Sequence, residues 1–194
     1  MFLMPPLDTP EAARLYERDK AQSGFVMNLS RAWAWRPDVC ESFLALRAML
    51  SSQSTLSPRE LAVLVCAMAG TLGDAYCSLA WGGRLAQAAD ARTAASVLKG
   101  EDDAAMSPRE RALAAWARQV VDDPNATTAE DVQRLRDAGL GEREIFEATV
   151  FVALRLAFST VNDALGVMPD GGLAESAPPE VREAVSYGRL PRRD

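Results

Sequence analysis

Cys77 stands at a point in the chain where a cysteine is easily made reactive. The apolar run before it is interrupted at Leu72-Gly73-Asp74, and Asp74 has the side chain of a helix N-cap, so Cys77 falls in the first turn of the next helix. The positive end of a helix dipole favours the thiolate, which is the nucleophilic form of cysteine. A free cysteine also packs well as a small apolar residue. The sequence therefore leaves two interpretations of Cys77 open, a nucleophile and an inert core residue.

Charged and aromatic residues flank Cys77 on the same stretch of chain. Asp74 lies within one helical turn, and its negative charge raises the pKa of a nearby thiol. Arg84 follows seven residues later on the same helical face and can offset that charge. Tyr76 and Trp81 add aromatic surface for an apolar ligand. We expect Cys77 and Asp74 in the catalytic site and Tyr76, Trp81 and Arg84 as substrate-binding residues.

The residue types that are missing exclude several kinds of chemistry. The chain of 194 residues has no histidine, and its three cysteines, Cys40, Cys66 and Cys77, are not closely spaced. A zinc site cannot be assembled from these residues, so we expect no metal. No glycine-rich phosphate loop is present, and no nucleotide cofactor is expected. We expect Cys40 and Cys66 to be reduced core residues.

Composition and charge indicate a single globular domain. Hydrophobic residues make up 48% of the chain, enough to close a core without disulfides. The net charge is −6 and no basic stripe appears, so nucleic acid is not an expected partner. The N-terminus lacks the pattern of a signal peptide, and no run approaches the roughly 18 apolar residues of a membrane span. We therefore expect a cytoplasmic protein that does not bind membranes.

Helix-start signals recur along the chain, and strand signals are absent. Ser57-Pro58-Arg59-Glu60 and Ser107-Pro108-Arg109-Glu110 each have the form of a capping box, and each precedes apolar residues at helical spacing. The two tetrapeptides indicate either a duplicated helical hairpin or, as we favour, convergent capping. Glu60 is explained as a capping partner, with a proton relay as the alternative. The pattern predicts an all-α fold.

The C-terminal third contains the longest apolar stretch, residues 145–165. It is hydrophobic nearly all round, which predicts a buried central helix or a subunit interface. The segment after Gly166 is richer in glycine, proline and charge, and one short helix is expected over residues 179–187. The predicted organisation is a helical domain over residues 1–170 and a C-terminal arm over residues 171–194, lying on the domain or on a neighbouring subunit.

Several marks, taken in order, resemble one protein family. They are the capping box at Glu60, the turn Gly73-x-x-Tyr76-Cys77, the segment from Asp131-Val132 to Glu144-Ile145, and the ending Val161-Asn162-Asp163-Ala164-Leu165-Gly166. Over residues 10–170 or so, the chain resembles the alkylhydroperoxidase D-like (AhpD-like), or carboxymuconolactone decarboxylase, proteins, particularly their peroxidase-related subgroup. The resemblance implies an all-α domain of six to nine helices that assembles as a homo-oligomer, a trimer or a hexamer.

The family's site is a glutamate, a Cys-x-x-Cys pair and a histidine, with the second cysteine attacking the peroxide and the first resolving the product. The resemblance places Glu60 on the glutamate, Asp74 on the first cysteine, Cys77 on the second and Trp81 on the histidine. It therefore implies that Glu60 is catalytic together with Cys77 and Asp74. Two extra residues lie between Glu60 and Cys77, so Glu60 does not necessarily reach the site. The pair and the histidine are therefore degenerate here.

A second alignment of the motif is open. With Cys77 as the first cysteine, Ala80 replaces the second and Arg84 the histidine, but the Tyr-Cys mark then fits less well. In the preferred alignment the resolving thiol is absent. A one-cysteine mechanism remains, in which an external thiol, or Cys66, reduces the sulfenic acid formed on Cys77.

The resemblance implies an antioxidant oxidoreductase that reduces organic hydroperoxides weakly through Cys77, with a small-molecule substrate, an external thiol reductant and no cofactor. Two alternatives stay open. One is a catalytically silent oligomeric binding protein that keeps the fold. The other is a cysteine-independent lyase or isomerase of a small lactone or carboxylate, in which Arg84, Asp74 and Glu60 supply the polar groups.

Overall fold

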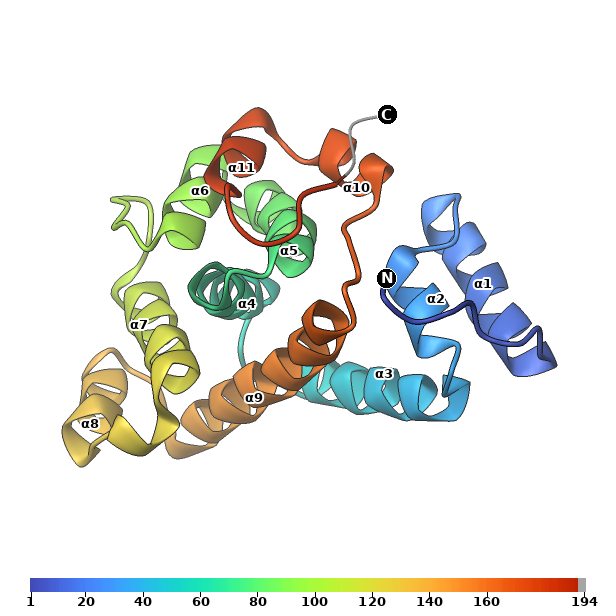
Figure 1. The fold of residues 1–194 in the computed structure, drawn as a ribbon. Coiled ribbons are helices and arrows are strands. Elements are labelled where there is room, and N and C mark those ends of the chain that lie inside the picture. Colours follow the sequence, from blue (N-terminus) through green and yellow to red (C-terminus); the bar gives the residue numbers. More distant parts are fainter. Residues whose placement is uncertain (192–194) are drawn as a thin grey trace.

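The computed structural model describes residues 1–191, which form eleven α-helices and one short 3₁₀-helix (Figure 1). Within this range no strand is present, which confirms the all-α prediction. The elements are α1 (Pro10–Ser23), α2 (Asn28–Trp33), α3 (Pro37–Ser52), α4 (Pro58–Leu72), α5 (Ala75–Ala88), α6 (Ala91–Lys99), α7 (Pro108–Asp122), η1 (Pro124–Ala126), α8 (Ala129–Asp137), α9 (Glu142–Ala164), α10 (Gly171–Ser176) and α11 (Pro179–Ala184).

Helix α4 is the centre of the core. Nine consecutive residues, Leu61 to Ala69, are buried on all sides, because α5, α6, α7 and α9 pack around it (Figure 1). Of the two alternatives for residues 145–165, a buried central helix or a subunit interface, the first was wrong. Helix α9 buries one face through residues such as Phe151, whereas Phe146 on the opposite face is 69% exposed. A subunit interface on that exposed face stays a prediction.

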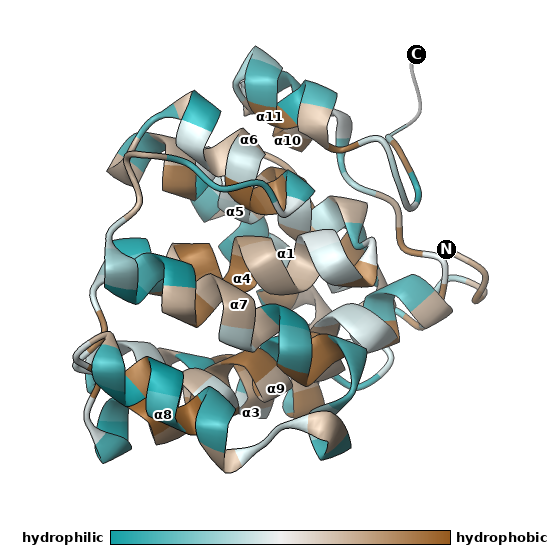
Figure 2. Cartoon of the chain, turned by 90° about the vertical axis from the view of Figure 1, so that its left-hand side faces the viewer, coloured by the Kyte–Doolittle hydropathy of each residue, from teal (hydrophilic) through white to brown (hydrophobic). Residues whose placement is uncertain are grey.

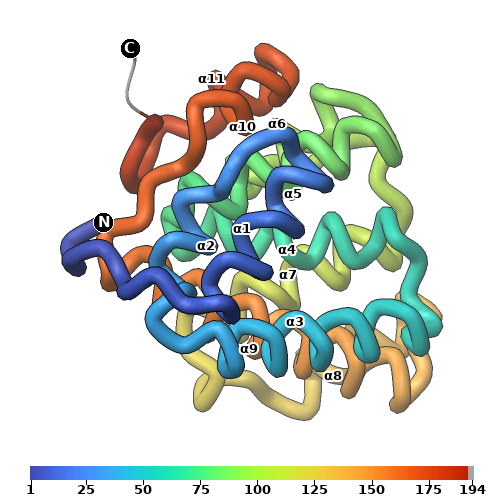
Figure 3. The backbone as a smooth tube through the Cα atoms, turned by 90° about the vertical axis from the view of Figure 1, so that its right-hand side faces the viewer, coloured from blue at the N-terminus to red at the C-terminus, as the bar shows by residue number. Residues whose placement is uncertain are grey.

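The N-terminal helices α1, α2 and α3 build a second, smaller core against the C-terminal half of α9. Leu15, Trp33, Cys40 and Phe158 are its buried members. The rings of Trp33 and Phe158 stack with their centroids 4.9 Å apart, and Trp33 Nε1 donates to Asn162 Oδ1 at 2.8 Å. Figure 3 shows α1 and α2 in front of α4 and α5, so these helices cover one side of the main core.

The C-terminal segment folds back onto the same chain. Val181 of α11 is completely buried among α5 and α6, and the Tyr187 and Ser78 hydroxyls hydrogen-bond at 2.9 Å. One helix over residues 179–187 was predicted, but α11 ends at Ala184 and α10 is an additional helix. The last three residues of the predicted arm lie outside the described residues.

Polar residues cover the outward turns of the bundle. Figure 2 shows hydrophilic residues along α8 and on the outer turns of α7, while α4 and α9 carry hydrophobic residues toward the interior. Among residues 1–191, no helix combines the length and the apolar character needed to cross a membrane.

Candidate active site

Cys77 lies in the first turn of α5, as the sequence predicted. Helix α4 ends at Gly73, whose φ of 77° is the left-handed conformation that glycine adopts without strain, and this lets the chain reverse at once into α5. Asp74 is the N-cap, and its Oδ1 accepts a hydrogen bond of 3.0 Å from the Cys77 amide. The turn therefore fixes Cys77 and Asp74 beside each other at the positive end of the α5 dipole.

Two donors from α9 reach the Cys77 sulfur. Arg155 Nη2 donates to Sγ at 3.0 Å and Ser159 Oγ donates to it at 3.2 Å, and both side chains are buried. They lie four residues apart, one helical turn, so they present donors to the same atom. A guanidinium and a hydroxyl at this distance stabilise negative charge on sulfur, which is the charge of a thiolate.

Arg155 was not among the site residues predicted from the sequence. It is the only charged residue between Glu147 and Asp163, in the middle of the longest apolar stretch. A lone cation in such a stretch requires a partner, because an unpaired charge is costly to bury. This was the available signal, but the sequence could not show that the partner is Cys77.

Burial opposes ionisation of the thiol. It raises the pKa of Cys77 from 9.0 to about 12; Arg155 and Ser159 act to lower it, whereas Asp74 raises it further. The side chain is only 4% exposed. Asp74 Oδ2 is also buried and has no hydrogen-bond partner among the described residues. The site thus combines a thiol that is protonated at neutral pH with a carboxylate oxygen that has no partner among residues 1–191.

A cavity of about 570 Å³ opens beside the cysteine, between the N-terminal helices on one side and α5, α9 and the start of α10 on the other. Cys77, Tyr76, Trp81 and Arg84 all line it. The Cζ atoms of Arg84 and Arg155 lie 4.5 Å and 5.3 Å from the centroid of the Trp81 ring. The structure therefore brings together the three residues predicted to bind substrate, although their role stays a prediction.

The Tyr76 hydroxyl is not free to meet a ligand. It donates to Asp170 Oδ2, and Asp170 Oδ1 accepts a second hydrogen bond of 3.0 Å from the Asn28 amide. Burial and the neighbouring Asp170 carboxylate raise the pKa of Tyr76 above its usual range. The hydroxyl thus ties α5 to Asp170, which in turn accepts from the start of α2, while Tyr76 also lines the cavity.

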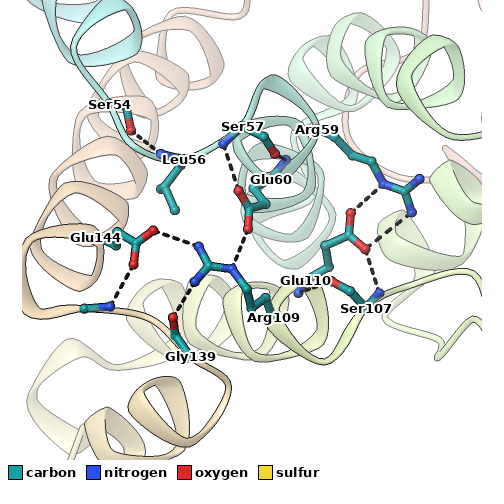
Figure 4. A network of polar contacts seen from close by, with 11 residues as sticks. Ser54, Leu56, Ser57, Arg59, Glu60, Ser107, Arg109, Glu110, Gly139 and Glu144 are labelled. Atoms are coloured by element: carbon teal, nitrogen blue, oxygen red, sulfur yellow. Dashed lines mark hydrogen bonds and ion pairs between the residues drawn. The ribbon is translucent and has the colours of Figure 1, made fainter.

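Glu60 belongs to a different part of the molecule. It closes the capping box of α4 by accepting from the Ser57 amide at 2.8 Å, and its other oxygen accepts from Arg109 Nε at 2.9 Å (Figure 4). Glu60 does not line the cavity. Leu72, at the other end of α4, follows it by twelve positions, about 18 Å along the axis. Of the two carboxylates predicted to act with Cys77, Asp74 therefore lies next to it and Glu60 does not.

The two capping boxes pair with each other. Arg59 of the first forms an ion pair with Glu110 of the second, while Arg109 of the second pairs with Glu60 of the first (Figure 4). The N-terminal turns of α4 and α7 therefore lie side by side. Both copies of the tetrapeptide are therefore explained by a structural role, since each supplies an arginine and a glutamate to these ion pairs.

The other two cysteines are buried and unpaired, as the sequence predicted. Cys66 has no exposed surface, and burial and the nearby Cys77 raise its pKa well above the usual range for a thiol. Cys40 lies in the small core beside Trp33. Neither lines the cavity, so Cys77 is the thiol that faces it.

No protein-family model and no curated protein matches the sequence. Solved structures do match. An uncharacterized peroxidase-related protein from Silicibacter sp. TM1040 is 21% identical, with a TM-score of 0.77 over 88% of this chain and 92% of that one. A peroxidase-related protein from Ralstonia eutropha JMP134, described as an alkylhydroperoxidase AhpD core, is 22% identical, with a TM-score of 0.74 over 99% and 100% of the two chains.

The debrominase Bmp8 is also similar in structure. Its apo form is 14% identical, with a TM-score of 0.76 over 96% of this chain and 99% of that one. A cysteine-to-alanine variant of it, in complex with 2,3,4-tribromopyrrole, matches with a TM-score of 0.73 over 90% and 95%. At these identities the likeness establishes architecture. The chain has the all-α, AhpD-like fold of the peroxidase-related proteins.

Proposed function

We propose that this protein is a thiol-dependent peroxidase that reduces organic hydroperoxides with Cys77 as its only catalytic cysteine. One observation carries the proposal: the Cys77 sulfur accepts hydrogen bonds from Arg155 and Ser159 and borders a cavity large enough for an organic substrate. The likeness to peroxidase-related AhpD-core structures supports the same chemistry.

The reaction runs in two steps. The Cys77 thiol gives its proton to Asp74 Oδ2, and the sulfur attacks the terminal oxygen of the hydroperoxide. The O–O bond breaks, a sulfenic acid forms on Cys77, and the alkoxide takes the proton from Asp74 and leaves as an alcohol. Two molecules of an external thiol then reduce the sulfenic acid, releasing water and a disulfide. Arg155 and Ser159 stabilise the charge on sulfur during the attack.

The buried thiol limits the rate. With a pKa near 12, only a small fraction of Cys77 is ionised at neutral pH, and the thiolate is the attacking form. Cys66 is fully buried, and the structure gives the sulfenic acid no exposed second cysteine with which to form a disulfide. Turnover is therefore expected to be slow and to depend on the added thiol.

The test compares wild type with Cys77→Ser in the reduction of cumene hydroperoxide by excess dithiothreitol. We expect the enzymatic rate to fall to the uncatalysed background in Cys77→Ser. Cys40→Ala is the matched control, since Cys40 is equally buried but does not itself line the cavity, and it should keep the wild-type rate. Equal consumption by wild type and Cys77→Ser would sink the proposal. A wild type without activity, and with an unreactive Cys77, would favour the silent binding protein instead.

A second candidate is the removal of a halide from a halogenated aromatic ring. The observation in its favour is that Trp81 and Phe158 form an aromatic wall of the cavity beside the Cys77 thiol, in a fold shared with a debrominase. Release of bromide from 2,3,4-tribromopyrrole in the presence of thiol, lost in Cys77→Ser, would distinguish it from peroxide reduction.

A further inference from the structure

Four arginines from four different helices line the cavity. Arg18 comes from α1, Arg47 from α3, Arg84 from α5 and Arg155 from α9. Ten other cationic side chains in residues 1–191 form ion pairs with carboxylates, but none of these four does. The chain as a whole carries a charge of −6, so this cavity reverses the sign of the molecule's charge.

The carboxylates on the cavity are already engaged elsewhere. Asp19 Oδ2 accepts from the Met27 amide at 3.0 Å, and Asp170 accepts from the Tyr76 hydroxyl and the Asn28 amide. Both therefore hold the surrounding chain in place. Two carboxylates, even if both are charged, do not neutralise the four guanidinium groups that line the cavity.

The arginines also act on one another. Desolvation, followed by the charges of Arg155, Arg84 and Arg18, lowers the pKa of Arg47. Arg155 is 95% buried (relative exposure 5%), and its Nε has no hydrogen-bond partner among the described residues. A buried N–H on a cation without an acceptor is costly. An anion in the cavity would supply the acceptor and relieve the repulsion.

We propose that the cavity binds an organic anion. Its oxyanion head group, a carboxylate or a phosphate, pairs with Arg47 and the neighbouring arginines, and its apolar body lies against Trp81 and Phe158, within reach of the Cys77 sulfur. Guanidinium groups suit both head groups because they donate two parallel hydrogen bonds. As a statement about the substrate, the inference rests on the proposed function; as a statement about binding, it does not.

The experiment measures binding by calorimetry, at fixed ionic strength and near pH 7.5, without peroxide or thiol. The probes are 2-naphthoate, 2-naphthyl phosphate and the neutral 2-naphthamide, which share one aromatic body. We expect at least one anion to bind about tenfold more tightly than the amide, the gain typical of a charge-assisted hydrogen bond. The tighter of the two anions identifies the head group. Equal affinities for all three, or no binding of either anion, would overturn the inference.

Variants locate the site. Arg47→Gln should weaken the preferred anion by about tenfold and leave 2-naphthamide unchanged. Arg84→Gln gives a second comparison at an exposed position, with circular dichroism confirming that both variants fold. Arg14→Gln is the control, because Arg14 is exposed on α1 and pairs with Glu11 outside the cavity. An equal loss in Arg14→Gln and Arg47→Gln would contradict a specific site.

The outcomes separate this inference from the peroxidase. Cumene hydroperoxide is neutral, so its reduction tests Cys77 without needing the arginines to bind an anion. Anion binding with no turnover would leave the inference standing and remove the proposed function. Turnover of cumene hydroperoxide with no preference for anions would do the reverse.

Discussion

At the scale of single residues, two opposing effects act on the pKa of the Cys77 thiol: burial raises it and the Arg155 guanidinium lowers it. Because its pKa is raised to about 12, the rate of alkylation by iodoacetamide should rise steadily from pH 7 to pH 10. A thiol with the ordinary pKa of 9.0 is about nine-tenths ionised at pH 10, so its rate approaches a plateau there. Arg155→Gln removes the guanidinium that favours the thiolate, so at pH 8 we expect slower labelling than in wild type. Mass spectrometry of the Cys77 peptide measures both. An approach to a plateau by pH 10 in wild type would contradict the expected state of the thiol.

Asp163, near the end of α9, carries a second perturbed charge. Desolvation and the charge of Asp74 raise the pKa of Asp163 from 3.8 to about 6, although Arg189 opposes this. A carboxyl whose pKa is raised by folding binds its proton more tightly in the native state. The folded protein therefore loses stability as pH rises from about 4 through 6.

Asp163→Asn should remove the loss of stability that ionisation of Asp163 causes. At pH 7.5 we expect the variant to be more stable than wild type by about 1 kcal/mol, a value reduced for the partial exposure of the side chain. Near pH 3, where Asp163 is largely protonated in both states, most of the difference should disappear. Urea unfolding at the two pH values gives the comparison. A variant less stable than wild type at pH 7.5 would show that the charge has a partner that outweighs its desolvation.

The residues that the sequence could assign to the site all lie on one helix. Asp74, Tyr76, Cys77, Trp81 and Arg84 became neighbours because the turn and the helical repeat fix their positions over a few residues. The donors to the sulfur lie more than 70 residues farther along the chain, on α9. Their contact depends on how α5 packs against α9, and spacing along the chain does not reveal this.

Glu60 is a residue whose local contact could be predicted from the sequence but whose role in the site could not. Its place in a capping box was predictable from Ser57 three residues earlier, and the structure confirms it. Its place in a catalytic site was expected only from the resemblance. That role stays untested, and the structure supplies the glutamate with Ser57 and Arg109 as partners instead.

At the scale of elements, the packing of α5 against α11 depends on one glycine. A Cβ added at Gly82 would lie 2.6 Å from Val181 Cγ1 and 3.0 Å from Leu98 Cδ1, closer than atoms pack. Gly82→Ala should therefore destabilise the protein by about 1–3 kcal/mol, even though alanine is the better helix former. Thermal unfolding followed by circular dichroism measures the change.

Gly83 is the matched control, one residue farther along α5. An added Cβ there meets nothing within 4 Å, so Gly83→Ala should be neutral or stabilise by up to about 1 kcal/mol. Combining Gly82→Ala with Val181→Ala should cost less than the sum of the two single changes, because the second removes the atom in the way. Equal effects at Gly82 and Gly83 would mean that α11 does not pack closely against α5.

The elements that the sequence missed or misplaced have physical reasons in common. Helix α10 was not predicted, and α11 ends at Ala184 although the helix was expected to reach residue 187. Both have six residues, too few for an apolar repeat to show or for a helix to persist without packing. Helices α4 and α9 are both rich in apolar residues, and the pattern did not distinguish them. Only the packed structure shows that α4 is enclosed on every side, whereas α9 presents one face outward.

At the scale of the whole molecule, arginines at the helix starts tie distant parts of the chain together. Arg109, at the start of α7, donates to Glu60 of α4, to Glu144 of α9 and to the Gly139 carbonyl before α9 (Figure 4). Three helices that begin at residues 58, 108 and 142 are thus fastened at their N-terminal turns. The contacts among these starts hold the helices of the main core at fixed angles, and α9 in turn carries Arg155 and Ser159 to Cys77.

Arg109→Gln tests this junction. The change leaves two partly buried glutamates without their cation, so at pH 7 we expect a loss of about 1–2 kcal/mol of unfolding free energy. Arg111→Gln, on the same helix but paired with the exposed Asp102, should cost less than about 0.5 kcal/mol. Urea denaturation of both variants and wild type makes the comparison.

The pH dependence gives the sharper readout. The hydrogen bond from Arg109 is the largest cause that lowers the pKa of Glu144. Glu60 also has a lowered pKa: desolvation raises it, but the Ser57 amide and Arg109 outweigh that effect. A carboxyl with a lowered pKa stabilises the fold above its ordinary value of 4.5 and loses that contribution as the pH falls. The deficit of Arg109→Gln should therefore shrink between pH 5 and pH 3, since both glutamates become neutral and need no cation. A deficit that is the same at pH 3 and pH 7 would mean that Arg109 acts by packing and not by its charge.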